Sequence, residues 1–192
     1  MNYHNQYQAA FIDRDGVINL DKGYTYKVKD LSVYNDAYDG LKELQKHGFK
    51  LFIITNQSGI ARGFYNINQF KRFMDALIIN LASKGVYIDD YFYCPHHIDG
   101  TVKEFSIKCD CRKPSPGLIH QAMKKYSIDL ERSILIGDKN TDIEAGLSAG
   151  IQINIKINRD KEYAYVESAT YNVSNMIDAA KLITDIHKSD AK

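Results

Sequence analysis

Two aspartates separated by one residue follow a short apolar run near the start of the chain. The run 9–12 predicts a buried strand, and Asp13, Asp15 and Gly16 come directly after it. Glycine allows a sharp turn, so we expect Asp13 at the carboxyl tip of the strand and Asp15 in the adjoining loop. Open α/β sheets place their active sites at that edge. An ordinary strand-to-turn boundary is the alternative, because Asp and Gly are also common turn residues.

Two later positions add polar side chains at the ends of predicted strands. Thr55 and Asp138 each follow a further short apolar run. The carboxyl ends of parallel strands share one edge, so we expect Asp138 beside Asp13 and Asp15. Two carboxylates ~4 Å apart repel by about 4 kcal/mol at an effective dielectric near 20, so either their pKa values rise or a cation neutralises them. Oxygen ligands with open positions suit Mg²⁺.

A phosphoryl group bound beside such a cation needs further positive charge and hydrogen-bond donors. Lys113 supplies an ammonium and Thr55 a hydroxyl, and together with Mg²⁺ they would offset the charge of a transferring phosphoryl group. A surface charge ahead of a turn is the alternative for Lys113. For Asp142, a charge that complements a helix dipole is nearly as good an interpretation as a role in the site.

A second cluster of chemically capable residues combines sulfur with nitrogen. Cys94, His96, Cys109 and Cys111 fit a closed tetrahedral zinc site, which is structural because no ligand position is left for a substrate. Their spacings are tighter than in ordinary zinc fingers, and His97 is an alternative to His96 as the ligand. Buried cysteines beside a surface histidine are the competing interpretation.

The rest of the sequence supplies the elements that position these residues. Short apolar runs alternate with segments of amphipathic helical period, which predicts an α/β fold with a doubly wound parallel sheet. Asn66 and Gln69 predict a capping pair, and Ser115-Pro116 predicts an N-cap with proline at the first helical position. The predicted strands are 9–12, 49–54, 91–93, 133–136 and 151–155, and the predicted helices are 37–47, 67–84, 116–126, 143–149 and 174–187.

Length and charge set the limits on the class of protein. The chain has 192 residues, 25 Lys and Arg against 24 Asp and Glu, and a formal net charge of +1. We expect a single domain spanning 1–192, with the zinc loop 94–111 as an insertion and no large cap. The charge balance argues against nucleic-acid partners, and no apolar run suggests a membrane span or an export signal. A cytoplasmic monomer is therefore expected.

The motifs, taken together, resemble those of the haloacid-dehalogenase (HAD) superfamily of phosphatases. The resemblance rests on Asp-x-Asp-Gly-Val after a strand, on Thr55, on Lys113-Pro114 and on Gly137-Asp138-x-x-x-Asp142. It implies that Asp13 is the nucleophile and that Asp15 is the general acid and base. It also implies that Asp13, Asp138 and the Asp15 backbone carbonyl hold Mg²⁺, that Thr55 and Lys113 bind the phosphoryl group, and that Asp142 orients Lys113 or the metal shell.

A zinc loop directly before Cys-Arg-Lys-Pro is similar to two families within that superfamily. The run 55–63 and the loop 19–24 resemble the D-glycero-D-manno-heptose 1,7-bisphosphate 7-phosphatases nearly letter for letter, apart from Lys22, where those enzymes often carry histidine. This implies Mg²⁺-dependent removal of the 7-phosphate through an aspartyl-phosphate, a step in nucleotide-activated heptose and lipopolysaccharide biosynthesis. The substrate-binding residues expected on this basis are Asp21, Lys22, Gly23, Tyr24, Asn56, Gln57, Ser58, Arg112 and Lys139.

Arg112 and Lys139 also have a physical reason to bind substrate. A sugar bisphosphate brings a second phosphate, and cations beside Lys113 and Asp138 could hold it, although surface charges balancing the acidic residues are the alternative. The histidinol-phosphate phosphatases are the second family. Their substrate brings an imidazole instead of a second phosphate. From another class, the zinc loop with its basic neighbours could be a nucleic-acid-binding module, against which the near-zero net charge counts.

Overall fold

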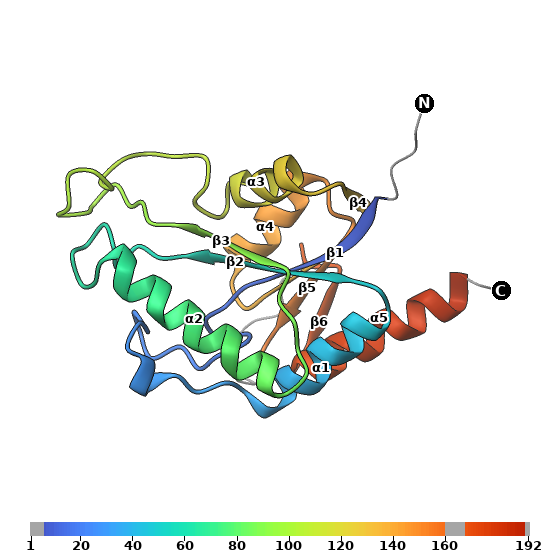
Figure 1. The fold of residues 1–192 in the computed structure, drawn as a ribbon. Helices are drawn as coiled ribbons and strands as arrows, with labels where there is room; N and C mark the ends of the chain where they lie inside the picture. Colours follow the sequence, from blue (N-terminus) through green and yellow to red (C-terminus); the bar gives the residue numbers. More distant parts are fainter. Residues whose placement is uncertain (1–5, 160–167, 191–192) are drawn as a thin grey trace.

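A six-stranded, wholly parallel sheet forms the centre of the computed structural model, which describes residues 6–159 and 168–190. The first five residues of the polar N-terminal segment thus lie outside the described residues. The strands follow one another across the sheet in the order β3-β2-β1-β4-β5-β6 (Figure 1). Their bounds are β1 Tyr7–Ile12, β2 Lys50–Asn56, β3 Asp90–Cys94, β4 Ile128–Gly137, β5 Ile153–Ile157 and β6 Tyr171–Val173.

Helices cover both faces of this sheet, as the doubly wound prediction requires (Figure 1). One face carries α1, α2 and α5, and the other carries α3 and α4. A short 3-10 helix, η1, lies in the loop between β1 and α1. The bounds are η1 Val28–Asp30, α1 Asn35–Lys46, α2 Ile67–Ser83, α3 Gly117–Lys125, α4 Asn140–Ala149 and α5 Met176–Asp190.

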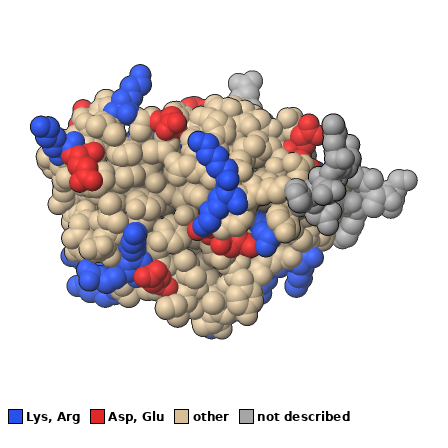
Figure 2. Space-filling view, turned by 45° about the horizontal axis from the view of Figure 1, so that its top comes forward, with Lys and Arg blue, Asp and Glu red and all other residues tan. Residues whose placement is uncertain are grey.

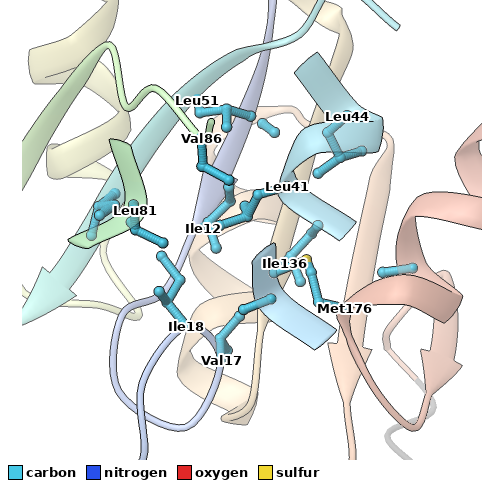
Figure 3. Packing of buried hydrophobic residues seen from close by; sticks show 14 of the residues in the cluster. Ile12, Val17, Ile18, Leu41, Leu44, Leu51, Leu81, Val86, Ile136 and Met176 are labelled. Atoms are coloured by element: carbon cyan, nitrogen blue, oxygen red, sulfur yellow. The ribbon is translucent and has the colours of Figure 1, made fainter. Parts of the chain in front are cut away.

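The alternation of side chains along β1 divides the core into two layers. Ala10 and Ile12 point to the face of α1, α2 and α5, whereas Ala9 and Phe11 point to the face of α3 and α4. On the first face, Ile12 lies in one cluster with side chains of α1 and of α5 (Figure 3). These four β1 residues have no exposed surface, so the end of β1 that precedes Asp13 is packed on both sides.

Several predicted elements are confirmed and others need correction. The five predicted strands all exist, and Asn66 and Gln69 form a reciprocal capping box at α2. No side-chain hydrogen bond caps α3, whose N-cap is Pro116 rather than Ser115. Neither β6 nor η1 was predicted from the sequence.

The sheet order reverses at β1, which pairs with β2 on one side and β4 on the other. Such a reversal opens a crevice at the carboxyl ends of the strands, because the flanking connections run in opposite directions. Ile12 is in register with Ile53 of β2 and Ile136 of β4. The residues that follow these three strands therefore meet at one place. No helix in the described ranges combines the length and the apolar character needed to cross a membrane.

Candidate active site and thiol cluster

Asp13 and Lys113, 100 residues apart in the sequence, form a buried ion pair at the carboxyl tip of β1. The Nζ of Lys113 lies 2.5 Å from Oδ1 of Asp13, 2.6 Å from Oδ1 of Asp142 and 2.9 Å from the backbone oxygen of Ile54. Lys113 is 4% exposed. An ammonium has three protons, and here three oxygen atoms surround it. The ammonium is thus held in a single orientation against Asp13.

The sequence left open whether Asp142 belongs to the site or to the start of a helix. In the structure its two carboxylate oxygens have separate partners. Oδ1 pairs with Lys113, and Oδ2 accepts a hydrogen bond of 2.9 Å from the backbone amide of Lys139. The second contact is a capping interaction at the start of α4. Asp142 therefore both closes the helix and orients the Lys113 side chain.

Asp138 lies next to this pair and has an unusual environment. Its Oδ1 is buried and has no hydrogen-bond partner among the described residues. An oxygen of Asp138 belongs to a group with Asp13 and Asp142 in which the carboxylate oxygens lie within 4.8 Å of one another. A Cβ on Gly16 would lie 2.2 Å from Oδ2 of Asp138, so glycine at that position makes room for the carboxylate.

Burial and the mutual repulsion of carboxylates determine the electrostatics of this acidic cluster. Burial raises the pKa of Asp13 above its ordinary value, and although Lys113 lowers it, the carboxylates of Asp142 and Asp138 raise it again. Burial likewise raises the pKa of Asp138, against the effect of Lys139. For Lys113, burial lowers the pKa, but the two adjacent carboxylates outweigh it. An orphaned buried carboxylate oxygen beside a second aspartate fits an oxygen-coordinated divalent ion such as Mg²⁺.

Asp15 lies apart from this cluster and is held by several donors. Its carboxylate accepts hydrogen bonds from Arg14, from Asn19 and from Gln57. Arg14 and Asn19 were not predicted as functional residues. The available signal for Arg14 was its place between the two aspartates, since alternation along an extended chain turns that side chain toward the core.

A cavity of 420 Å³ opens beside Asp15 and Lys113 and gathers most of the predicted substrate-binding residues. Tyr65 and Thr141, which were not predicted, also line it. Lys22 is exposed and does not line the cavity, so the structure gives no support to its predicted contact. The predicted residues that do line it are Asp21, Gly23, Tyr24, Asn56, Gln57, Ser58, Arg112 and Lys139.

Two of these lining residues are already engaged within the protein. The side chain of Asn56 donates to the backbone oxygen of Lys113 and accepts from its backbone amide, both at 3.0 Å. Gln57 donates to Thr55 and to Asp15, and it accepts a hydrogen bond of 2.6 Å from Tyr65. Thr55 accepts from Gln57, which leaves its own hydroxyl proton available to a ligand. Asn56 and Gln57 therefore position Lys113 and Asp15.

The mouth of the cavity has an aromatic rim. Tyr24 adopts a left-handed backbone conformation with φ of 52°, which non-glycine residues rarely adopt. Its ring meets the exposed ring of Phe64 edge-on, with centroids 4.6 Å apart. The loop after β1 and the loop after β2 therefore meet at the entrance.

The thiol cluster has the composition and the spacing of a zinc site. The sulfur atoms of Cys94, Cys109 and Cys111 lie 3.1–3.6 Å apart, and Nδ1 of His96 lies 3.3 Å from the Cys111 sulfur. A tetrahedron with zinc–sulfur bonds of about 2.3 Å has edges of about 3.8 Å, whereas a disulfide bond measures about 2.05 Å. The ring of His97 faces Arg62 instead. The cluster thus includes His96 rather than His97 and fits zinc.

Backbone hydrogen bonds join the thiol cluster to the acidic site. The backbone oxygen of Cys94 accepts from the amide of Gln57 at 2.8 Å, and Lys113 is only two residues beyond Cys111. The backbone oxygen of Ala61 accepts from the amides of Thr101 and Val102. The long loop between β3 and α3 projects from the sheet beside the loop that follows β2 (Figure 1). The thiol cluster therefore lies directly beside the segment that carries Lys113.

Comparison with known proteins agrees with this geometry. A HAD-hydrolase-like family model matches residues 110–155. The chain is 52% identical over 148 residues to D-glycero-alpha-D-manno-heptose-1,7-bisphosphate 7-phosphatase of Photorhabdus laumondii, covering 77% of this chain and 81% of the relative. It is 37% identical over 182 residues to the beta-named enzyme of the same organism, covering 94% and 97%.

Solved structures show the same fold. A HAD-like phosphatase from Mesorhizobium loti superposes with a TM-score of 0.85 at 29% identity, covering 95% of this chain and 87% of that one. A D,D-heptose 1,7-bisphosphate phosphatase from B. bronchiseptica, solved with magnesium and phosphate, superposes with a TM-score of 0.79 at 24% identity, covering 93% and 99%. The chain belongs to the D-glycero-D-manno-heptose-1,7-bisphosphate 7-phosphatase family of HAD-like hydrolases and is a phosphoric monoester hydrolase.

Proposed function

We propose that this protein removes the 7-phosphate of D-glycero-D-manno-heptose 1,7-bisphosphate through an aspartyl-phosphate on Asp13. The single observation that carries the proposal is the buried pairing of Asp13 with Lys113 beside the orphaned Oδ1 of Asp138. A nucleophile, a fixed ammonium and a candidate ligand for a divalent ion therefore lie together at the carboxyl edge of the sheet. This is the arrangement that in-line phosphoryl transfer needs.

The reaction divides into two displacements at phosphorus. A carboxylate oxygen of Asp13 forms a bond to phosphorus while the bond to the 7-oxygen of the sugar breaks, and Asp15 gives that oxygen a proton. Water then attacks the phosphorus of the aspartyl-phosphate, Asp15 takes the proton from the water, and Asp13 is regenerated. The hydroxyl of Thr55 and the ammonium of Lys113 bind the phosphoryl oxygens in both steps.

Two metal ions would serve different purposes in this scheme. Asp13, Asp138 and the backbone carbonyl of Asp15 would hold Mg²⁺, which supplies charge neutralisation for the transferring phosphoryl group when bound. Support comes from the orphaned Asp138 oxygen and from the magnesium and phosphate held by the B. bronchiseptica relative. The thiol cluster would hold a structural zinc ion, since its four ligands complete a tetrahedron.

The cations that line the cavity favour a substrate with two phosphate groups over one with a single phosphate group. Arg112 and Lys139 line it together with Lys113, so cations are available to a second phosphate at the far end of the sugar. Lys139 lies 3.4 Å from Asp21, which also lines the cavity. We propose the alpha anomer as the preferred substrate, because the relative with 52% identity is named for it and the relative with 37% identity is named for the beta anomer.

The alternatives have less support. Histidinol phosphate carries an imidazole in place of the second phosphate, and the cations of the cavity offer it no partner. A nucleic-acid-binding module would need a basic surface. On the face shown in Figure 2, acidic and basic side chains are interspersed over a largely neutral surface, in keeping with the net charge of +1.

Phosphate release from both heptose bisphosphate anomers and from histidinol phosphate, with and without Mg²⁺, tests the proposal. ³¹P NMR of the product identifies which phosphate is lost. We expect Mg²⁺-dependent loss of the 7-phosphate, fastest with the alpha anomer. Faster hydrolysis of histidinol phosphate, or loss of the 1-phosphate, would overturn the proposed substrate.

A further inference from the structure

Arg14, which lies between the two aspartates of the first motif, takes no part in the scheme above. It has no exposed surface, yet it is a charged residue directly behind the site. Its guanidinium faces Asp15 as a fork, with Nε 3.1 Å and Nη2 2.9 Å from Oδ1 and with Nη2 2.6 Å from Oδ2. Burying a guanidinium is costly unless it is paired and hydrogen-bonded, so its surroundings bear on what it does.

The pocket around Arg14 fixes the guanidinium in place. Nη2 donates to the backbone oxygen of Thr25 at 2.8 Å. The guanidinium carbon lies 4.7 Å from the ring centroid of Phe73 and 5.7 Å from that of Phe70, and Nη1 lies 3.7 Å from the sulfur of Met74. Asp15 is its one acidic partner in the part of the chain that the structure describes. The guanidinium is therefore held in one orientation, and the Asp15 carboxylate is held against it.

The two oxygens of Asp15 differ in how they are held. Oδ1 receives Arg14 through two nitrogens and Asn19 at 2.9 Å, so its lone pairs are fully used. Oδ2 receives Arg14 and, at 3.1 Å, the side chain of Gln57. Gln57 and Asp15 both line the cavity. Arg14 thus holds Oδ2 closely from the core side, and only the longer Gln57 contact on the cavity side can give way to a proton.

We propose that Arg14 is a positioning residue whose fork holds both oxygens of Asp15 and thereby orients the carboxyl group for proton transfer to and from the phosphoryl site. The inference rests on the proposed function, in which Asp15 is the general acid and base. A structural ion pair with no catalytic consequence is the competing explanation. The two explanations differ in whether the effect of Arg14 depends on the leaving group.

Two substrates separate these explanations. The sugar alkoxide of heptose 1,7-bisphosphate needs a proton to leave, whereas the phenolate of p-nitrophenyl phosphate leaves without one. Since kcat/KM covers the steps up to phosphorylation of Asp13, we expect Arg14→Met to lower kcat/KM on the order of 10²-fold for the sugar substrate and only a few-fold for the aryl phosphate. Methionine suits the apolar pocket of Phe70, Phe73 and Met74. Equal losses on both substrates would overturn the proposal.

The chain offers a matched control in Arg159. Its guanidinium pairs in a fork with Asp36, donates to the backbone oxygens of Gly16 and Val17, and lies 3.5 Å from the ring centroid of Tyr34. We expect Arg159→Met to lower the melting temperature without changing the ratio of kcat/KM between the two substrates. If it changes that ratio as much as Arg14→Met does, the effect comes from lost stability and the proposal fails.

A double-mutant cycle with Asp15 distinguishes failure of this inference from failure of the proposed function. Asp15→Asn should itself lower kcat/KM for the sugar substrate by roughly 10²–10⁴-fold and spare the aryl phosphate; if it does not, the role of Asp15 is wrong. If it does, adding Arg14→Met to Asp15→Asn should cost nothing further. A full additive loss in the double variant would overturn the positioning role of Arg14 alone.

A conservative variant covers the case in which Arg14→Met does not fold. Arg14→Lys keeps the charge but cannot form two parallel hydrogen bonds. We expect it to lose kcat/KM for the sugar substrate less than Arg14→Met does, with the aryl phosphate again nearly unaffected. A well-folded Arg14→Lys enzyme with full activity on the sugar substrate would contradict the need for the fork.

Discussion

The acidic cluster gathers its side chains from distant parts of the chain, whereas the thiol cluster gathers them from the single segment 94–111. Asp13 and Asp138 follow strands of a rigid sheet, and Asp138 keeps a buried oxygen without a partner among the described residues. Cys94 ends β3, whereas His96, Cys109 and Cys111 lie in the loop that follows it, and the four form a closed set. Oxygen ligands with open positions serve chemistry, and a closed sulfur and nitrogen set serves structure.

The connection between the two clusters shows why the loop needs such a set. Lys113 lies two residues beyond Cys111, and Asn56 holds its backbone with two hydrogen bonds. The sheet positions the aspartates by itself, whereas the ammonium opposite them comes from a long loop. A metal ion in the loop would hold Lys113 in position, as the strands hold Asp13.

The largest expected effect is at the acidic cluster. Asp13→Asn removes the nucleophile without a change of shape, so we expect phosphate release to fall by roughly 10⁴-fold or more. The melting temperature should stay within about 3 °C, because asparagine keeps an oxygen for Lys113, which also retains Asp142 and the backbone oxygen of Ile54 as partners. Retained turnover in a well-folded variant would refute the nucleophile assignment.

Loss of the thiol cluster should act mainly on stability. Cys109→Ser removes one ligand, and we expect it to abolish stoichiometric zinc binding, measured by elemental analysis, and to lower the melting temperature. Activity should fall about 10–100-fold through displacement of Lys113. A variant that melts like the parent and lacks zinc would show that the cluster does not stiffen the loop.

Two glycines give a matched pair, one at each cluster. A Cβ on Gly16 would lie 2.2 Å from Asp138 at a φ of +85°, and a Cβ on Gly117 would lie 2.3 Å from the backbone oxygen of Asp110, between two of the cysteines. We expect Gly16→Ala to raise the Mg²⁺ concentration needed for half activity and to retain zinc. Gly117→Ala should weaken zinc retention instead. If Gly16→Ala lost zinc and Gly117→Ala raised the Mg²⁺ requirement, the assignment of a different metal to each cluster would be wrong.

The smallest expected effect lies away from both clusters. Burial raises the pKa of Asp36, but hydrogen bonds from Arg159 and from the backbone amide of Met176 outweigh it, so the pKa is lowered. Asp36→Asn should therefore cost on the order of 1 kcal/mol at pH 7, about 2–4 °C in melting temperature. The cost should persist above pH 3.8, the unperturbed value, and vanish as the pH falls through the lowered pKa. A cost independent of pH would exclude the ion pair as its source.

Much of the fold followed from the sequence because its central strands β1, β2 and β4 contain continuous apolar runs buried on both faces. Its edge strand β6 could not be predicted, since its three residues are only half buried and form no such run. The convergence of Asp13 and Asp138 was predictable from strand ends in a parallel sheet. The partners of Asn56 and Gln57 were not, because a polar residue at a strand end fits a substrate contact and an internal hydrogen bond equally well.

Arg14 is a further residue whose surroundings could not be predicted from the sequence. Its charge predicts exposure, whereas alternation along the chain indicates only that it leaves β1 on the core side. Its burial against Phe70 and Phe73 depends on α2, a helix more than 50 residues away in the sequence. Sequence spacing gave no information about this tertiary contact. The packing of α2 on the sheet decides where the guanidinium lies.

Borohydride trapping of the enzyme during turnover tests the central claim most directly. Reduction of an aspartyl-phosphate converts that residue to homoserine, which mass spectrometry of the digested protein locates. With heptose 1,7-bisphosphate and Mg²⁺ present, we predict homoserine at position 13, and none when either is omitted. Modification at Asp15 or Asp138 instead, or none during active turnover, would contradict a covalent mechanism at the tip of β1.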